Sequence, residues 1–469
     1  MNIYPPHIFK IIFMNTTDST LTKYKGGSFG EIFSICLPLM LTAVSGSLMY
    51  FFDRVILARY SIDAMNAAVS GWMAFAVLQF AVYAVASITE VFVGQYNGAK
   101  RYRDLGAPVW QMLYFALISG MVFIPLAFVA GPWVIPDHYE SLGVPYFKWT
   151  VLLGMFFPMI GALSGFFVAQ GKTKMVLLIA AVSNVLNILL DYLFVFGVEG
   201  LIPSMGTKGA AVATGVSQML AVAAYLILFL KPLHRREHGT GDAHFRPSLF
   251  MRCLKVGVPA AIGHALEIFP WALLLGLVAR QGDIHMTVFV VCQSVFILFV
   301  FVSEGLQKGV TAIVSNYVGK RALGMIPDVL RSGAKLCLLM AGITFIPFWF
   351  YPDVIVSTFL SEGLGAYGFA ELEDIFRISL MGVWAALAFD FFAWLLVGTI
   401  IGAGDTRFFM WVSSVSGWLF AMLPVWAGYH FFQAGPIYAP LIFWFSTSCT
   451  ALCYYVRYRS GRWKGKELI

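Results

Sequence analysis

Residues 91–100 read VFVGQYNGAK, and a related stretch, VSNYVGKR, follows at residues 314–321. The shared pattern is Gln95-Tyr96-x-Gly98 against Asn316-Tyr317-x-Gly319, at a distance of 221 positions, and Pro38 returns as Pro259 at the same distance. A third pair, Gly171-x-Thr173-Lys174 and Gly404-x-Thr406-Arg407, lies 233 positions apart. The change of distance predicts an insertion of 12 residues in the second half, near 352–374. The chain is therefore expected to consist of two similar halves.

The composition places most of the chain in a membrane or in a protein interior. Of its 469 residues, 59% are hydrophobic and 12% are charged, whereas soluble domains carry about 25% charged residues. The formal net charge of +7 does not indicate a nucleic-acid partner, because zinc-finger, RRM and helix-turn-helix spacings are absent from the sequence. The six cysteines lie in apolar stretches without metal-ligand spacing, which predicts buried thiols rather than disulfides or a metal site.

Twelve segments are long and apolar enough to be membrane-spanning helices, which need about 20 such residues. They lie near 32–58, 64–92, 106–131, 147–170, 175–197, 209–230, 251–279, 286–312, 331–351, 372–401, 407–428 and 437–457. Residues 231–249 form the longest polar connection and separate two bundles of six. The predicted fold is therefore all-α, with two six-helix bundles related by a pseudo-two-fold axis along the membrane normal. Such duplicated membrane proteins are usually transporters, because the halves can move about a site between them.

The basic residues predict the orientation in the membrane. Lys and Arg gather in alternate loops, such as those with Lys100 and Lys320, whereas acids such as Asp137 and Asp353 lie in the opposite loops. The basic side is expected to be cytoplasmic, which predicts a protein of the cell (inner) membrane with both termini in the cytoplasm. The expected organisation is a cytosolic tail (1–30), an N-lobe (31–230), a cytosolic linker (231–249), a C-lobe (250–457) and a basic cytosolic tail (458–469). No secretory signal is evident, and Met14 is an alternative start.

Two polar segments resemble functional motifs, but a structural role is the better interpretation of each. His234, His238 and His244 in the linker have the composition of a metal cluster, and we interpret them as part of a solvated linker. The turn Gly404-Asp405-Thr406 offers an N-cap for the next helix. It lacks the strand context and the Lys-Ser/Thr ending of a phosphate-binding loop.

Six acidic residues lie inside the apolar spans, namely Asp53, Glu90, Asp191, Glu267, Glu304 and Asp390. A charge at the bilayer centre costs about 2.5–3.5 kcal/mol on insertion scales, so it persists mainly where function or pairing retains it. Asn184, Asn187 and Asp191 share one helix face, where they could hold a proton or a small cation. The alternative is that they form hydrogen bonds between helices. Asp53 is a similar candidate, beside an Arg54 that either neutralises it in part or extends to the surface.

The remaining acids differ in depth. Glu267 and Asp390 lie well inside their helices and are expected to be functional. Glu90 and Glu304 lie nearer the cytoplasmic ends, where they are secondary candidates or water-exposed residues at a mouth. Lys308 follows Glu304 by one turn and could simply pair with it. The abundant aromatic residues could stack on aromatic cations, although lipid contact explains most of them.

Over residues 31–457 the chain resembles the multidrug and toxic compound extrusion (MATE) transporters. The resemblance rests on five segments in order, namely LPLMLTAVSGSLMYFFDRVI, VFVGQYNGAK, NVLNILLDYLFVFGVEGLIPSMGTKGAAVAT, GVPAAIGHALEIFPWALLLG and FDFFAWLLVGTIIGAGDTRF. The resemblance implies a proton or sodium site in the N-lobe at Asp53, Asn187 and Asp191. In the NorM-like branch it implies a cation site in the C-lobe at Glu267 and Asp390.

The chain departs from that family pattern at three places. Arg54 stands where small or uncharged residues are common, and Ala386 replaces a tyrosine of NorM-like members. The turn at 170–173 reads Gln-Gly-Lys-Thr where Gly-Asp-Thr is usual.

The expected function is a secondary antiporter that exports small organic, often cationic, compounds in exchange for protons or sodium. A deprotonated acid would attract a cationic substrate, and ion entry would release it outward. The expected protein is a monomer that contacts membrane lipids and needs no cofactor beyond its coupling ion. Sodium, if used, would bind at the same acids. One alternative is a flippase for lipid-linked saccharides or peptidoglycan precursors, and another is a channel or receptor. An enzyme is the least expected, because no nucleophile-base or metal constellation appears.

Overall fold

The computed structural model describes residues 21–359, 369–466 and 468–469. Twelve helical spans in this part of the chain are long and apolar enough to cross a membrane, which confirms the predicted number. The β structure of the described residues is an isolated bridge between Val198 and Ile202. The chain is thus an all-α, multi-pass integral membrane protein. Most of the expected N-terminal tail and the centre of the expected insertion near 352–374 lie outside the described residues.

The helices form two bundles joined by the linker. The N-lobe contains α2 (Phe29–Tyr60), α3 (Ile62–Ala86), α4 (Thr89–Gly98), α5 (Gly106–Val129), α6 (Gly131–Val134), α7 (Glu140–Leu153), α8 (Phe156–Val168), α9 (Thr173–Phe196) and α10 (Gly206–Phe229). The linker contains α11 (Pro232–His238). The C-lobe contains α12 (Pro247–Ala279), α13 (Asp283–Gly319), α14 (Ile326–Phe350), α15 (Pro352–Phe359), α16 (Phe369–Gly402), α17 (Thr406–Ser416), α18 (Leu423–Phe432) and α19 (Tyr438–Arg459).

The repeat found in the sequence is also a repeat of backbone conformation. Lys100 follows α4 with φ 58°, and Arg321 follows α13 with φ 56°. Non-glycine residues rarely adopt this left-handed conformation, and these two lie 221 positions apart. Each is followed by a short 3₁₀ helix, at Tyr102–Asp104 and at Leu323–Met325. The two halves therefore fold alike around these turns, as the shared motif predicts.

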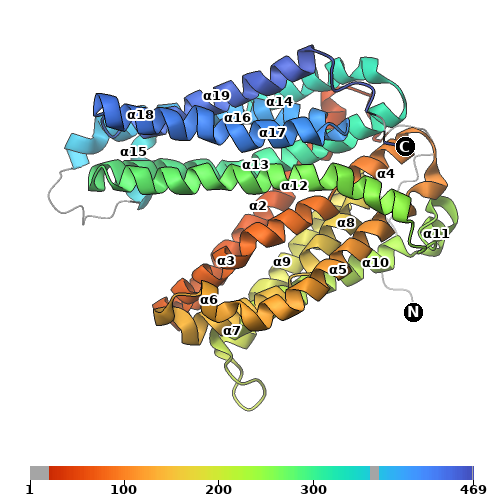
Figure 1. Ribbon diagram of the computed structural model, residues 1–469, viewed down its shortest axis with the longest axis horizontal. Coiled ribbons are helices and arrows are strands. Elements are labelled where there is room, and N and C mark those ends of the chain that lie inside the picture. Colours follow the sequence, from red (N-terminus) through yellow and green to blue (C-terminus); the bar gives the residue numbers. More distant parts are fainter. Residues whose placement is uncertain (1–20, 360–368, 467) are drawn as a thin grey trace, which may run out of the picture.

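The two lobes meet at the end of the molecule that carries the basic loops, which we call the basic end. Figure 1 shows the helices of the lobes converging there, near the C-terminus, and diverging toward the other end. A cavity of about 480 Å³ lies at the basic end, and four basic residues help to line it, namely Lys100, Arg101, Lys320 and Arg321. The lobes diverge at the opposite end (Figure 1).

Glycines allow the helices of the two lobes to pack backbone against backbone along an interface that we call the seam, formed by α2 and α4 against α13. A Cβ at Gly319 would lie 2.7 Å from the carbonyl carbon of Gln95, and a Cβ at Gly98 would lie 2.9 Å from that of Asn316. These contacts are reciprocal, because the two pairs occupy equivalent places in the repeat. The amide of Asn97 adds a hydrogen bond of 2.7 Å to Oδ1 of Asn316.

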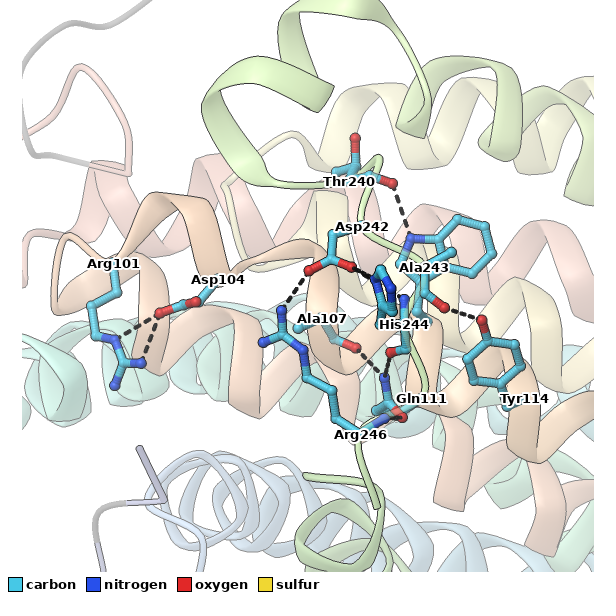
Figure 2. Close-up of polar contacts among 11 residues, drawn as sticks. Arg101, Asp104, Ala107, Gln111, Tyr114, Thr240, Asp242, Ala243, His244 and Arg246 are labelled. Carbon is cyan, nitrogen blue, oxygen red and sulfur yellow. Dashed lines mark hydrogen bonds and ion pairs between the residues drawn. The ribbon is translucent and has the colours of Figure 1, made fainter. Parts of the chain in front are cut away.

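The linker is docked on the N-lobe, although most of its residues, including His244, are exposed, as expected of a solvated segment. Figure 2 shows side chains of α5 that reach its backbone carbonyls. The Trp110 indole donates to Thr240 at 2.9 Å, and the amide of Gln111 donates to His244 at 3.1 Å. The Tyr114 hydroxyl donates to Ala243. The same Gln111 accepts from the backbone N–H of Arg246 at 2.9 Å. These bonds hold the second half of the linker against the surface of α5.

Two of the three linker histidines are partly buried beside a lysine from the 170–173 turn. Lys172 Nζ lies 3.2 Å from Nε2 of His234, whose Nδ1 lies 2.8 Å from the carbonyl of Leu228. The rings of His234 and His238 have centroids 5.3 Å apart. Burial, and then the charge of Lys172, lower the pKa of both histidines to about 4. Burial also lowers the pKa of Lys172 itself to about 8. Both rings are therefore neutral at physiological pH and act as packing groups.

Asp405 does not cap α17 with its side chain, contrary to the expectation for its turn. Its carboxylate is fully buried and pairs with Arg457 at 2.7 Å and with Lys466. Residue 468, two positions further along, donates its backbone N–H to Oε1 of Gln95 at 2.9 Å. The segment after α19 is thus fixed against both lobes at the basic end.

Candidate functional site

The two acids predicted for the N-lobe face each other. Asp53 on α2 and Asp191 on α9 lie within hydrogen-bonding reach of each other's carboxyl groups. Apart from this contact, Oδ1 of Asp53 and both oxygens of Asp191 have no hydrogen-bond donor among the described residues. Asp191 is fully buried. Two buried carboxyl groups side by side repel when both are charged, so the pair favours a shared proton or a bound cation.

The two asparagines on the same face of α9 have different surroundings. Asn187 is fully buried, donates to the Thr214 hydroxyl at 3.3 Å, and leaves its Oδ1 without a partner among the described residues. This oxygen lies one turn from Asp191 and is a further ligand for a cation. Asn184 donates to the hydroxyl of Ser45 on α2 at 2.7 Å. It therefore forms the hydrogen bond between helices that was the alternative interpretation.

A small cavity of about 30 Å³ lies beside Asp53. Its lining includes Tyr50, Arg54, Trp72 and Tyr146. A polar cavity needs only about 10–15 Å³ to hold one water molecule, so this space is large enough for a water or a small cation. Trp72 and Tyr146 are not recognisable as site residues in the sequence, because their only signal is aromatic character in a chain with 16% aromatic residues.

In the C-lobe, Asp390 on α16 is held by two donors. The Ser303 hydroxyl on α13 donates to Oδ2 at 2.7 Å, and the Trp394 indole, one turn along α16, donates to Oδ1 at 3.1 Å. The carboxyl group is buried, with 8% of the residue exposed. The i, i+4 spacing of Asp390 and Trp394 was visible in the sequence, but the contribution of Ser303 was not.

Glu267 on α12 lies in the same lobe, close enough to Asp390 for their charges to interact. His264, one turn earlier on α12, stacks on Trp394 with ring centroids 5.9 Å apart and an angle of 11°. The His264 ring also lies beside the Phe409 ring, with centroids 4.8 Å apart. The structure thus brings Glu267 and Asp390 together within an aromatic environment, and His264 is a member of this site that the sequence alone did not indicate.

The two secondary acids have different environments. Glu90 on α4 is buried, and its Oε1 has no hydrogen-bond partner among the described residues. Glu304 lies near the middle of α13, and its Oε1 is 2.9 Å from Nζ of Lys308. The pairing that the sequence allowed for Glu304 is therefore present.

Each lobe thus contains a pair of acids from two different helices, with one member buried (Asp191 or Asp390) and the other half-buried (Asp53 or Glu267). Buried carboxyl groups with unpaired oxygens can hold protons or small cations, and aromatic walls can contact organic cations. A family model described as MatE matches residues 38–193 and again residues 259–426. The two matches begin at Pro38 and Pro259, which the distance of 221 positions relates. The chain belongs to the MatE family. It is accordingly a membrane transporter of the MATE type and not an enzyme.

Proteins similar to this MATE transporter are found in several bacteria. The probable multidrug resistance protein NorM of Thermotoga maritima is 24% identical over 459 residues, which cover 94% of each chain. The protein of that name from Listeria innocua is 24% identical over 88% of this chain and 90% of its own. A solved MATE transporter in complex with MaL6 has a TM-score of 0.83 at 15% identity, covering 96% of this chain and 99% of that one. A MOP superfamily transporter from Pyrococcus furiosus has a TM-score of 0.80 at 14% identity, with the same coverage.

Proposed function

We propose that this MATE transporter is a secondary antiporter that exports small organic compounds, often cationic, in exchange for protons or sodium. The observation that carries the proposal is the contact between Asp53 and Asp191, whose buried oxygens lack other donors among the described residues. Such a pair binds a proton or a sodium ion readily, because the ion removes the repulsion between the two carboxylates. The relatives named as multidrug resistance proteins support organic substrates.

Orientation supports the direction of transport. The basic end belongs in the cytoplasm by the positive-inside rule, with both termini there and the protein in the cell (inner) membrane. The seam then closes the cytoplasmic side, and the lobes diverge toward the outside (Figure 1). This arrangement corresponds to the outward-facing state of a transporter that works by alternating access. The opposite state would require the seam to open.

The C-lobe acids supply the substrate side of the exchange in this proposal. Glu267 and Asp390 provide negative charge, and His264 and Trp394 provide aromatic surfaces, which together suit an aromatic cation. The ion enters the outward-facing state, binds the acids and releases the substrate outward. Because both lobes of the pathway belong to one chain, we propose that a monomer in the lipid bilayer is sufficient.

The test is uptake of ethidium into proteoliposomes under imposed proton or sodium gradients. The unaltered transporter is expected to take up ethidium under at least one of the two gradients. The D53N/D191N variant should lose the response to the gradient, and the E267Q/D390N variant should raise the ethidium concentration needed for half-maximal uptake. Gradient-driven uptake that persists in both variants would refute the proposed sites. Absence of uptake by the unaltered protein under either gradient, with binding of anionic lipid precursors, would favour a flippase.

A further inference from the structure

Lys308 connects the two lobes near the place where they begin to diverge. Its Nζ lies 2.9 Å from Oε1 of Glu304 on the same helix, α13. It also donates to the hydroxyl of Tyr83 on α3 at 3.0 Å. Glu304 belongs to the C-lobe and Tyr83 to the N-lobe, so a single ammonium group bridges them. The Tyr83 ring is itself held in the N-lobe, because it stacks on Phe157 with ring centroids 4.4 Å apart.

The repeat gives this bridge a special position. The shift of 221 that relates Gly98 to Gly319 also relates Tyr83 to Glu304 and Ser87 to Lys308. Lys308 therefore contacts Tyr83 and Glu304, which occupy equivalent positions in the two halves. The N-lobe has no equivalent cation, because the position that corresponds to Lys308 is Ser87. The Ser87 hydroxyl, at the equivalent place in the N-lobe, has no hydrogen-bond partner among the described residues. The bridge is thus an asymmetric feature on a nearly symmetric interface.

The bridge also lies within the packed seam, which continues one turn beyond it at Gly305, where a Cβ would lie 2.7 Å from the carbonyl carbon of Leu39. A Cβ at Gly309, next to Lys308, would lie 2.9 Å from Cα of Cys36 on α2. From Gly309 to Val318, toward the basic end, the residues of α13 are buried. The side chains of Lys308 and Glu304 retain 27% and 36% exposure, so the pair borders the side on which the lobes diverge. If the basic end opened, Tyr83 and Lys308 would separate, because they move with different lobes.

We propose that Lys308 is an interlobe lock that stabilises the state closed at the basic end through its bond to Tyr83. This proposal rests on the alternating-access mechanism proposed above. Glu304 positions the ammonium group for the bond. A cationic substrate that reaches Glu304 competes with Lys308 for the same carboxylate, and its binding therefore weakens the lock. Loss of a hydrogen bond to a charged group should shift the balance toward the opposite state by about tenfold or more.

Cys36 is a built-in reporter of the seam. Its Sγ is fully buried and directed at the backbone carbonyl of Leu306 at 3.8 Å. We would replace the other five cysteines by alanine and measure the rate at which N-ethylmaleimide modifies Cys36 in the purified transporter. K308M and Y83F are expected to raise this rate about tenfold or more. Two controls should leave the rate of Cys36 modification at that of the parent. They are K308R, which keeps the charge, and S87A, which removes the nearby hydroxyl that has no hydrogen-bond partner among the described residues.

The outcomes separate this proposal from the antiport mechanism. Unchanged labelling in both K308M and Y83F would overturn the lock, even if the parent shows gradient-driven ethidium uptake. Faster labelling in K308M alone would also overturn it, because the bond to Tyr83 would then not be the link between the lobes. If K308M fails to fold, Y83F carries the test by itself, since it removes a single oxygen. Failure of the antiport mechanism would instead appear as a parent that takes up no ethidium.

Discussion

Gly319 packs against the backbone of the other lobe in the seam, so a larger residue at this position is predicted to destabilise the closed state. A Cβ at this position would lie 2.7 Å from both Cα and the carbonyl carbon of Gln95, whereas ordinary contacts begin at 3.4 Å. The difference, 3.4 − 2.7, means that the G319A variant must move the two backbones apart by at least 0.7 Å. Side-chain rearrangement cannot relieve a contact between two backbones. The closed state should therefore lose about 1–3 kcal/mol, as in other overpacked interfaces.

Only the closed state suffers this strain, so G319A should favour the state open at the basic end. A loss of about 1–3 kcal/mol corresponds to a shift of about 5–150-fold in the equilibrium. The assay is a distance measurement by electron–electron double resonance between spin labels at Arg103 in the N-lobe and Arg331 in the C-lobe, both exposed at the basic end. G319A should add a population with longer distances and slow ethidium export.

Two glycines serve as comparisons. G98A should act like G319A, because its Cβ would lie 2.9 Å from the carbonyl carbon of Asn316 in the reciprocal contact. G324A is the matched control at the same end, because a Cβ there meets nothing within 4 Å. Distances in G319A that equal those of the unaltered transporter would refute the reasoning. An equal shift in G324A would refute it too.

Three further predictions concern other parts of the fold. Between pH 6.5 and about 4, His234 and His238 bind more protons in the undocked linker than in the docked one, so docking should weaken as the pH falls through this window. Amide exchange over 231–246 should therefore become faster relative to unstructured peptide, and H234Q/H238Q should abolish this pH dependence. N184A should lower thermal stability by about 0.6 kcal/mol, the average for a hydrogen bond between membrane helices, and leave ion dependence intact. D405N should destabilise by about 1–3 kcal/mol in thermal unfolding, because its two cationic partners lose a buried carboxylate. D328N, in an exposed pair, is the control for D405N and should change stability by less than about 1 kcal/mol.

The helices and the repeat could be predicted because they depend on local properties. Span length follows from the run of apolar residues, and the shared motif at 95–98 and 316–319 records one turn used twice. The pairing of Asp53 with Asp191 could be expected only from the family resemblance, because no spacing rule relates α2 to α9. The aromatic and polar partners of the acids, such as Tyr146 and Ser303, come from helices that the sequence does not place beside them.

The docking of the linker shows the same limit more clearly. Gln111, Tyr114 and Trp110 look like ordinary residues of an apolar helix, and residues 231–249 look like a solvated connection. Their hydrogen bonds form only because the fold places the start of α5 beside the returning chain (Figure 2). Likewise, Asp405 had the expected residue type for a helix cap, but two cations from the end of the chain outcompete the backbone for its carboxylate.

Antiport requires that substrate and ion exclude each other from the transporter, and this linkage can be measured directly. The measurement is the release of ions when ethidium binds to the purified protein, with protons followed in weakly buffered solution and sodium by a tracer. The unaltered transporter should release protons or sodium on binding, and D53N/D191N should bind ethidium with much less release. Ethidium binding by the unaltered protein without release of either ion would contradict coupled exchange at these acids.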